Sequence, residues 1–350
     1  FENKNNRINP VVRTKNGQIR GHQVNVLNKD VYEFVGIRYA QPPIGDLRFK
    51  KPVAVANWTD IYDATETRNI CWQANSSKYN REHMNEDCLF LNIWSSNLQT
   101  LKPVLFWIHG GAFIMGSSFS ESINGSALAT YHVVIVTINY RLGLFGFLYG
   151  GSEDAPGNAG LYDQLLALKW INENIKSFGG DPDQITISGE SAGAISVGLH
   201  LLSDMSKGLF KRAIIQSGAP YFPKNYGPTN EEYLNIAKSF SRELGCENES
   251  WMKCLKGLNA SDIHDKVNPF LFRNPIIDGE FCTQTAQQTF ELGQFNSDVQ
   301  ILTGVMLDEG TAFLLLYFQL TQKDPDANYT KDQLKQLLNY LVEHDLLLIH

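Results

Sequence analysis

An apolar strand that runs straight into a helix through a Gly-x-Ser-x-Gly turn is the feature that most constrains this chain. Residues 185–188 are a strand candidate, residues 189–193 are Gly-Glu-Ser-Ala-Gly, and a helix is expected from Ser191 to about Leu202. Such a turn brings backbone so close together that a Cβ on Gly189 or Gly193 would clash. Ser191 would project from the turn above the positive end of the helix. A glycine-rich turn that holds a serine by chance is the alternative.

Strand and helix patterns alternate along the rest of the chain. Asn16-Gly17 predicts a type I′ hairpin turn between two short strands in Val11–Gly21. A helix is expected over Asn158–Phe178, where apolar residues recur at helical spacing. The further strand candidates are Leu89–Trp94, Val104–Ile108, Val133–Asn139, Gln184–Ser188, Arg212–Gln216 and Val299–Gly304. These patterns predict one α/β domain with a mostly parallel central sheet, whose sites form at the carboxyl ends of its strands.

Charge and hydropathy exclude several classes of protein. The chain has 350 residues, with 30 Lys and Arg against 37 Asp and Glu, a net charge of −7. That sign repels phosphate backbones and anionic membrane surfaces, so a nucleic-acid partner is not expected. The longest apolar runs, such as Val133–Val136, are strand-sized, so no transmembrane segment is expected.

Cysteines and glycosylation sequons point to the secretory route. The five cysteines include two close pairs and show no metal-binding spacing, so no metal site is expected. Disulfides persist in secreted proteins, and we therefore expect a secreted or extracellular glycoprotein. The six Asn-x-Ser/Thr sequons begin at Asn57, Asn75, Asn124, Asn248, Asn259 and Asn328.

A second glycine-rich segment follows another apolar strand. Residues 107–113 are Trp-Ile-His-Gly-Gly-Ala-Phe, and such a loop can aim free backbone amides at the oxyanion of a tetrahedral intermediate. The amide of Ala192 would complete this oxyanion hole. His109 precedes the serine and introduces the loop, so we expect it to anchor the loop rather than to serve as the catalytic base.

Two adjacent carboxylates, Asp308 and Glu309, follow a late strand candidate. In α/β folds with this kind of turn the catalytic order is serine, acid, histidine, so an acid is expected near this position. Local sequence does not choose between the two residues, and a solvated turn is the alternative.

The chain resembles the type-B carboxylesterase and cholinesterase family of α/β-hydrolases. The resemblance runs from Gly17 to about Phe318. The matching segments are Phe34–Ala40, Glu86–Ile93, Asn139–Gly143, Gly157–Gln164, Phe178–Pro182 and Ile277–Phe281.

The resemblance implies roles for particular residues. Ser191 would be the nucleophile, Glu309 rather than Asp308 the triad acid, and Glu190 a substrate-binding residue. The amides of Gly111, Ala112 and Ala192 would bind the oxyanion. The implied disulfides are Cys71–Cys88 and Cys246–Cys254, which leaves Cys282 unpaired. Pro269–Phe272 would lie near the acyl pocket, although core packing explains that cluster equally well.

Three departures from the family pattern carry weight. Many members have glycine where this chain has Ala112, which narrows the conformational freedom of the loop. Cholinesterases carry a tryptophan in the first disulfide loop that holds a quaternary ammonium; here Ser77–Tyr79 occupy that region, and Tyr79 is a substitute or a surface aromatic. After Glu309 only His344 and His350 remain, both in a helical-looking segment over Lys331–Ile349, and neither fits the Gly-x-x-His position of the family's base.

Residues 1–350 are therefore expected to be the N-terminal portion of a longer single domain. By itself this portion should have little esterase activity. The favoured function is hydrolysis of a small-molecule carboxylic ester through an acyl-enzyme, without metal or cofactor. The alternatives are a cholinesterase and a non-catalytic adhesion protein of the same fold. The oligomeric state is not predicted.

Overall fold

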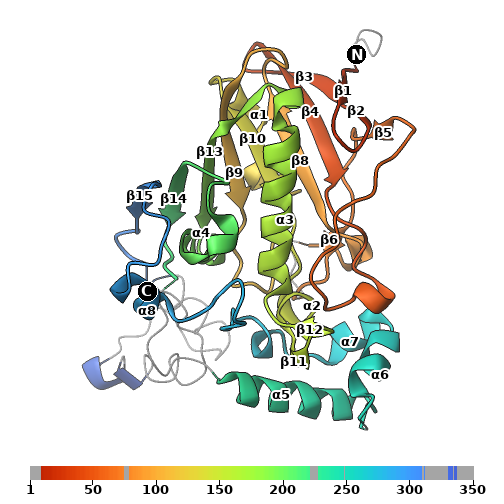
Figure 1. Ribbon diagram of the computed structural model, residues 1–350, viewed down its shortest axis with the longest axis vertical. Coiled ribbons are helices and arrows are strands. Elements are labelled where there is room, and N and C mark those ends of the chain that lie inside the picture. Colours follow the sequence, from red (N-terminus) through yellow and green to blue (C-terminus); the bar gives the residue numbers. More distant parts are fainter. Residues whose placement is uncertain are drawn as a thin grey trace.

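The computed structural model describes residues 9–309 except 75–78, 221–227 and 248, together with Thr311 and residues 330–333, 335 and 336. Its centre is an eight-stranded sheet with the order β15-β14-β13-β9-β10-β8-β4-β3 (Figure 1). The strands are β3 (His22–Val26), β4 (Lys29–Arg38), β8 (Phe90–Ser95), β9 (Lys102–Ile108), β10 (Val134–Ile138), β13 (Gly180–Glu190), β14 (Arg212–Gln216) and β15 (Gln300–Gly304).

Four of the seven strand pairs in this sheet are parallel and three are antiparallel, as expected for a mostly parallel sheet. Strands β10, β9, β13, β14 and β15 are parallel to one another. Strands β8, β4 and β3 add antiparallel pairs at one side. The central strands are covered on both faces, and every residue of β8 and β10 is buried. Six of the strand candidates in the sequence correspond to observed strands because continuous apolar runs suit a sheet covered on both faces. Sequence patterns missed β3 and β4.

Two long helices pack against the sheet. Helix α3 (Ala159–Asn174) continues as a 3-10 turn (Ile175–Phe178) and ends at Gly179, which has a left-handed φ of 75°. Helix α4 (Ala192–Leu202) packs against β13 and β14. The other helices are α1 (Ser126–Ala129), α2 (Gly143–Phe147), α5 (Asn230–Glu243), α6 (Trp251–Gly257), α7 (Ala260–Lys266) and α8 (Ala286–Glu291). Figure 1 shows α3 lying along the sheet and α5 to α7 gathered at one end of the molecule.

Small sheets cover the periphery. They are β1 (Val11–Arg13), β2 (Gln18–Arg20) and β5 (Tyr62–Asp63); β6 (Ile70–Cys71) with β7 (Met84–Asn85); and β11 (Tyr149–Ser152) with β12 (Ala155–Pro156). The predicted hairpin between β1 and β2 is present, but the predicted type I′ turn is wrong. Asn16 has no positive φ, and Gly17 has a φ of 148° because the turn is closed by hydrogen bonds between Thr14 and Gly17.

One large apolar core fills both faces of the sheet, and α5 to α7 enclose a second cluster with α2. Arg48 joins these parts. It forms an ion pair with Glu86 and donates to the carbonyls of Leu255, Lys256 and Leu258 at the end of α6. In the part of the chain that the structure describes, no helix is both long and apolar enough to cross a membrane.

Among the described residues, β15 is the outermost strand on one side of the sheet, and it carries exposed apolar side chains. Every residue of β15 is exposed; Leu302 in the strand is 66% exposed, and Leu307, three residues after the strand, is 97% exposed. An exposed apolar edge strand readily pairs with another chain. We therefore expect residues 1–350 to self-associate at micromolar concentration, and Leu302→Lys to reduce that association, as measured by analytical ultracentrifugation. Leu27→Lys, an exposed leucine at the tip of the β3–β4 hairpin, is the matched control and should not change it. A monomeric wild-type chain would contradict this expectation.

Candidate active site

Ser191 lies in a strained turn between β13 and α4. Its φ of 56° and ψ of −124° are unusual for a residue with a side chain, and strain of this kind gathers at functional sites. The turn is held from both sides, because the Ser191 amide donates to the carbonyl of Gln216 at 2.9 Å and its carbonyl accepts from the Ile195 amide at 2.9 Å. The predicted strand-turn-helix unit is therefore present.

The two glycines of the turn lie in direct backbone contact with other segments. A Cβ on Gly189 would lie 2.4 Å from the carbonyl carbon of Gly193. A Cβ on Gly193 would lie 2.1 Å from the carbonyl oxygen of Ile108, at the end of β9. Any side chain at these positions would force the backbone apart, so the glycines allow the nucleophile turn to pack against the neighbouring strand.

Gly193→Ala is therefore expected to lower the free energy of unfolding by about 1–3 kcal/mol. The added Cβ would meet the backbone carbonyl of Ile108, which cannot rotate away as a side chain could. Chemical denaturation measures this loss. Gly257→Ala is the matched control, because a Cβ at Gly257 meets no atom within 4 Å. That control should be neutral or slightly stabilising. Equal stability of the two variants would show that the contact at Gly193 is looser than the structure indicates.

The glycine-rich loop after β9 lies against Ser191. A Cβ on Gly110 would be 3.1 Å from the Ser191 Cβ and 2.5 Å from the carbonyl oxygen of Glu190. Gly111 has a φ of 110°, and Ala112 adopts a left-handed φ of 54° despite its side chain. Among the described residues, none accepts a hydrogen bond from the amides of Gly111, Ala112 or Ala192. Three free donors thus belong to the two segments that meet at Ser191.

His109 anchors this loop. Its ring is buried, lies 4.4 Å from the Tyr140 ring, and its Nδ1 is 2.8 Å from the Gly110 carbonyl. Burial lowers the pKa of His109 to about 4. A Cβ on Gly116 would fall 2.1 Å from Nδ1, so the ring fills the inside of the loop. The geometry supports the anchoring role expected from the sequence.

Glu309, and not Asp308, accepts hydrogen bonds from neighbouring groups after β15. The Ser217 hydroxyl and the Met306 amide donate to the Glu309 carboxylate and lower its pKa; the Met306 bond is 2.7 Å. Burial and the negative charge of Glu309 raise the pKa of Glu190, the residue before Ser191. Asp308 is exposed. The structure thus brings Ser191, Glu190 and Glu309 into one region.

Ser217 is a site residue that the sequence analysis missed. It follows β14, has a left-handed φ of 53°, and its amide donates to the Gly304 carbonyl at 2.9 Å. Strand β14 lies between β13, which Ser191 directly follows, and β15, which precedes the segment that contains Glu309. A polar residue at the end of the intervening parallel strand was the available signal.

The raised pKa of Glu190 predicts a pH-dependent effect of Glu190→Gln. The folded protein holds this proton more tightly than the unfolded chain, so the stabilising contribution is present below the ordinary pKa of glutamate and is lost as pH rises through the folded pKa. Glu190→Gln should therefore raise the melting temperature near pH 7 and have little effect near pH 4. The exposed control Asp308→Asn should lack this pattern. A stabilisation that grows toward acid pH would reverse the sign and contradict the account.

No described histidine contacts Ser191 or Glu309. His200 is buried in α4, where its ring nitrogens lie 2.7 Å from the Ser206 hydroxyl and 3.2 Å from the side-chain amide oxygen of Gln164. Its burial lowers its pKa to about 3. His344 and His350 lie outside the described residues. No cluster of metal-ligating side chains occurs in the described ranges.

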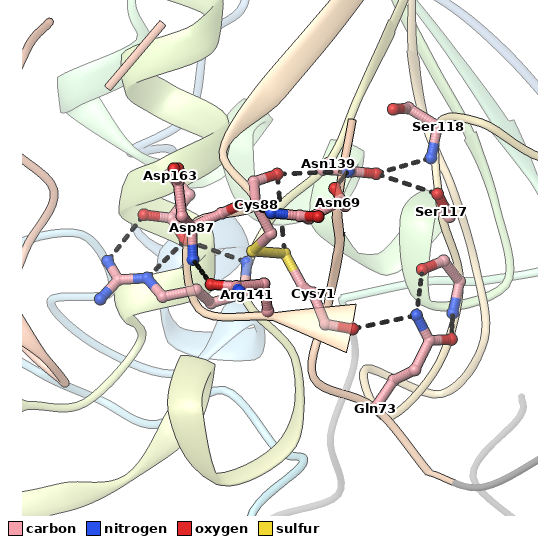
Figure 2. Close-up of a disulfide and its surroundings, with 12 residues drawn as sticks. Asn69, Cys71, Gln73, Asp87, Cys88, Ser117, Ser118, Asn139, Arg141 and Asp163 are labelled. Atoms are coloured by element: carbon pink, nitrogen blue, oxygen red, sulfur yellow. Dashed lines mark hydrogen bonds and ion pairs between the residues drawn. A yellow bond between two sulfur atoms is a disulfide. The ribbon is translucent and has the colours of Figure 1, made fainter. Parts of the chain in front are cut away.

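Both disulfides that the resemblance implies are present, Cys71–Cys88 and Cys246–Cys254. Cys282 is unpaired. Figure 2 shows Asn139, at the end of β10, beside the first disulfide: its amide group donates to the Cys88 carbonyl at 3.2 Å and accepts from the Ser118 amide at 2.7 Å. The first disulfide loop therefore lies against the segment that continues the glycine-rich loop.

The other sequence-predicted sites are placed as follows. Asn57, Asn124 and Asn259 are exposed, whereas Asn75, Asn248 and Asn328 lie outside the described residues.

Tyr79 lines a cleft of about 990 Å³ between the first disulfide loop and residues 117–122; Ser191 is not among its lining residues. Phe272 is buried in the second core cluster, whereas Phe270 is partly exposed.

Comparison with known proteins gives a consistent picture. The sequence profile of the Carboxylesterase family matches residues 8–347. A cholinesterase of Mus musculus is 40% identical over 94% of this chain and 58% of its own length. Acetylcholinesterases of Bungarus fasciatus and Danio rerio are 39% and 40% identical over 95% of this chain and 59% and 56% of their own lengths. The chain thus spans less than two thirds of these relatives. With its strand-turn-serine-helix unit and its central sheet, the chain belongs to the carboxylesterase family of α/β-hydrolases.

Proposed function

We propose that the complete protein hydrolyses small carboxylic esters through an acyl-enzyme. The complete protein here means residues 1–350 together with any further sequence that its gene encodes. Ser191 attacks the ester carbonyl, and the amides of Gly111, Ala112 and Ala192 bind the oxyanion that forms. Each such donor contributes about 3–4 kcal/mol to transition-state stabilisation. Water then attacks the acyl-enzyme and releases the acid. The packing of Gly110 against Ser191 carries this proposal, because it brings the free amides of the loop to the nucleophile.

The triad is completed by a histidine outside the described residues. That histidine takes the proton of Ser191 and returns it to the leaving alcohol, while Glu309 orients the ring and stabilises its charged form. Residues 1–350 then form the N-terminal portion of a single α/β-hydrolase domain. The pure 350-residue chain should react slowly with a fluorophosphonate probe, whereas the complete protein should react rapidly. Rapid reaction of the 350-residue chain that is lost in His344→Gln or His350→Gln would place the base within it.

Broad carboxylesterase activity is the first choice, and cholinesterase activity is the alternative. The similarity to proteins named cholinesterase and acetylcholinesterase favours the alternative. The replacement of the family's choline-binding tryptophan by the Ser77–Tyr79 region favours the first choice. Hydrolysis of acetylthiocholine and of a neutral aryl acetate by the complete protein separates the two. A kcat/KM for the choline ester well above that for the aryl ester would displace the broad carboxylesterase. A non-catalytic adhesion role is disfavoured by the presence of both Ser191 and Glu309.

The protein is further proposed to be a secreted glycoprotein. Two disulfides and the exposed sequons at Asn57, Asn124 and Asn259 support this assignment, since disulfides persist outside the cytosol. Treatment of the secreted protein with an N-glycosidase should lower its apparent mass. An unchanged mass would contradict glycosylation.

A further inference from the structure

Gln73 joins the first disulfide loop to the glycine-rich loop. Its amide nitrogen donates to the carbonyls of Gly116 and Cys71, each at 3.1 Å, and its amide oxygen accepts from the Gly116 amide at 2.9 Å (Figure 2). Gln73 is 3% exposed. Its neighbour Ala74 donates a fourth bond, from its amide to the carbonyl of Ile114 at 2.8 Å. A buried side chain therefore binds both polar groups of one glycine, much as a paired strand would.

The held glycine touches the parts of the loop that meet the nucleophile. A Cβ on Gly116 would lie 2.1 Å from the His109 ring and 2.7 Å from the Gly110 carbonyl oxygen. Gly110 itself packs against Ser191. Between them, the amides of Ile114 and Met115 both donate to the Gly111 carbonyl at 3.0 Å. If Gly116 moved, Gly110 and Gly111 would have to move as well, because close backbone contacts connect them to it.

We propose that Gln73 is a positioning residue for the oxyanion hole, holding the amides of Gly111 and Ala112 at the geometry that the transition state requires. This inference rests on the proposed function. The loop needs such a support because Ala112 and Phe113 both adopt left-handed φ values, which relax if the loop is released. Preorganised donors stabilise an oxyanion only while they stay in place, and a displacement of about 1 Å costs on the order of 100-fold in rate.

The test compares, in the complete protein, two interactions of the first disulfide loop: the hydrogen bonds of Gln73 with Gly116 and the ion pair of Arg81 with Asp265. Gln73→Leu removes the bonds to Gly116, and Gln73→Ala leaves space for water to bind Gly116 if the leucine variant folds poorly. Arg81→Ala is the matched control. Arg81 pairs with Asp265 in α7 at 2.6 Å and lies over the Trp72 ring, so it ties the disulfide loop to α7 and not to the glycine-rich loop. Its loss loosens the disulfide loop without touching Gly116.

We expect the Gln73 variants to lower kcat for an aryl acetate about tenfold or more while KM changes less than about twofold. Their affinity for a trifluoromethyl ketone, which forms an oxyanion on the catalytic serine, should fall by the same factor as kcat. Arg81→Ala should leave both quantities within about twofold of the wild type. If the Gln73 variants behave like Arg81→Ala in kcat and in ketone affinity, Gln73 has only a structural role and the inference is wrong.

Hydrogen exchange separates this inference from the proposed function. Gln73→Leu should accelerate amide exchange in residues 110–116 of the 350-residue chain, whereas Arg81→Ala should not. Suppose that exchange is accelerated in Gln73→Leu but the complete wild-type protein hydrolyses no ester. The proposed function would then be wrong, whereas the conclusion that Gln73 holds the glycine-rich loop in place would remain valid. An active wild-type protein with unchanged exchange and kinetics in Gln73→Leu would overturn the inference alone.

Discussion

Replacing Ser191 with alanine in the complete protein is expected to lower kcat for an aryl acetate by about six orders of magnitude. The loss is this large because the histidine and the acid act only through the serine hydroxyl, and the oxyanion hole alone leaves a small residual rate. The fold should be retained, since the backbone of residue 191 is held by Gln216 and Ile195 and not by its side chain. Steady-state hydrolysis and a melting curve measure the two effects.

Ser188→Ala supplies the control for this experiment. Ser188 lies three residues before Ser191 and is buried within β13. Its replacement should leave kcat within a few-fold of the wild type, because its hydroxyl is enclosed by the fold. If Ser191→Ala kept more than about one per cent of the wild-type kcat, another group would be the nucleophile and the acyl-enzyme mechanism would fail.

Exchanging Glu309 for glutamine should lower kcat by about four orders of magnitude, whereas the same change in charge at Asp308 should have little effect. The carboxylate of Glu309 accepts hydrogen bonds from Ser217 and Met306, and its negative charge raises the pKa of Glu190, which supports its proposed role of orienting the catalytic histidine. Asp308 is exposed. The two residues are adjacent and both acidic, so the pair Glu309→Gln and Asp308→Asn controls for local charge.

The kinetics of these two variants identify the acid directly. A large loss of kcat in Asp308→Asn with little loss in Glu309→Gln would reverse the assignment. Large losses in both would indicate that the loop after β15 is displaced by either change, which a melting curve would detect. The rate of fluorophosphonate labelling should follow kcat, because both reactions need the activated serine.

Local sequence predicted the nucleophile turn because all of its parts are contiguous. The strand, Gly189, Ser191, Gly193 and the helix lie within about twenty residues, and the steric need for glycine follows from the turn alone. Strand β14 was predicted with its observed bounds for the same reason, since an apolar run of strand length between turns has few alternatives.

Features that depend on distant contacts were not accessible in this way. Nothing near Ser217 in the sequence shows that it faces Glu309, more than ninety residues later; the order of the strands brings them together. Gln73 likewise meets Gly116 only because the disulfide loop folds against β9 and its following loop. The choice of Glu309 over Asp308 as the triad acid came from family resemblance and stays a prediction; in the structure Glu309 accepts hydrogen bonds from Ser217 and Met306, whereas Asp308 is exposed.

The most direct test of the central assignment is to map the covalent adduct formed when the complete protein reacts with a fluorophosphonate. Tryptic digestion and mass spectrometry should place a single stoichiometric adduct on Ser191, and prior incubation with the trifluoromethyl ketone should prevent it. A stoichiometric adduct on a different residue, or no adduct on a complete protein that hydrolyses esters, would contradict the assignment of Ser191 as the nucleophile.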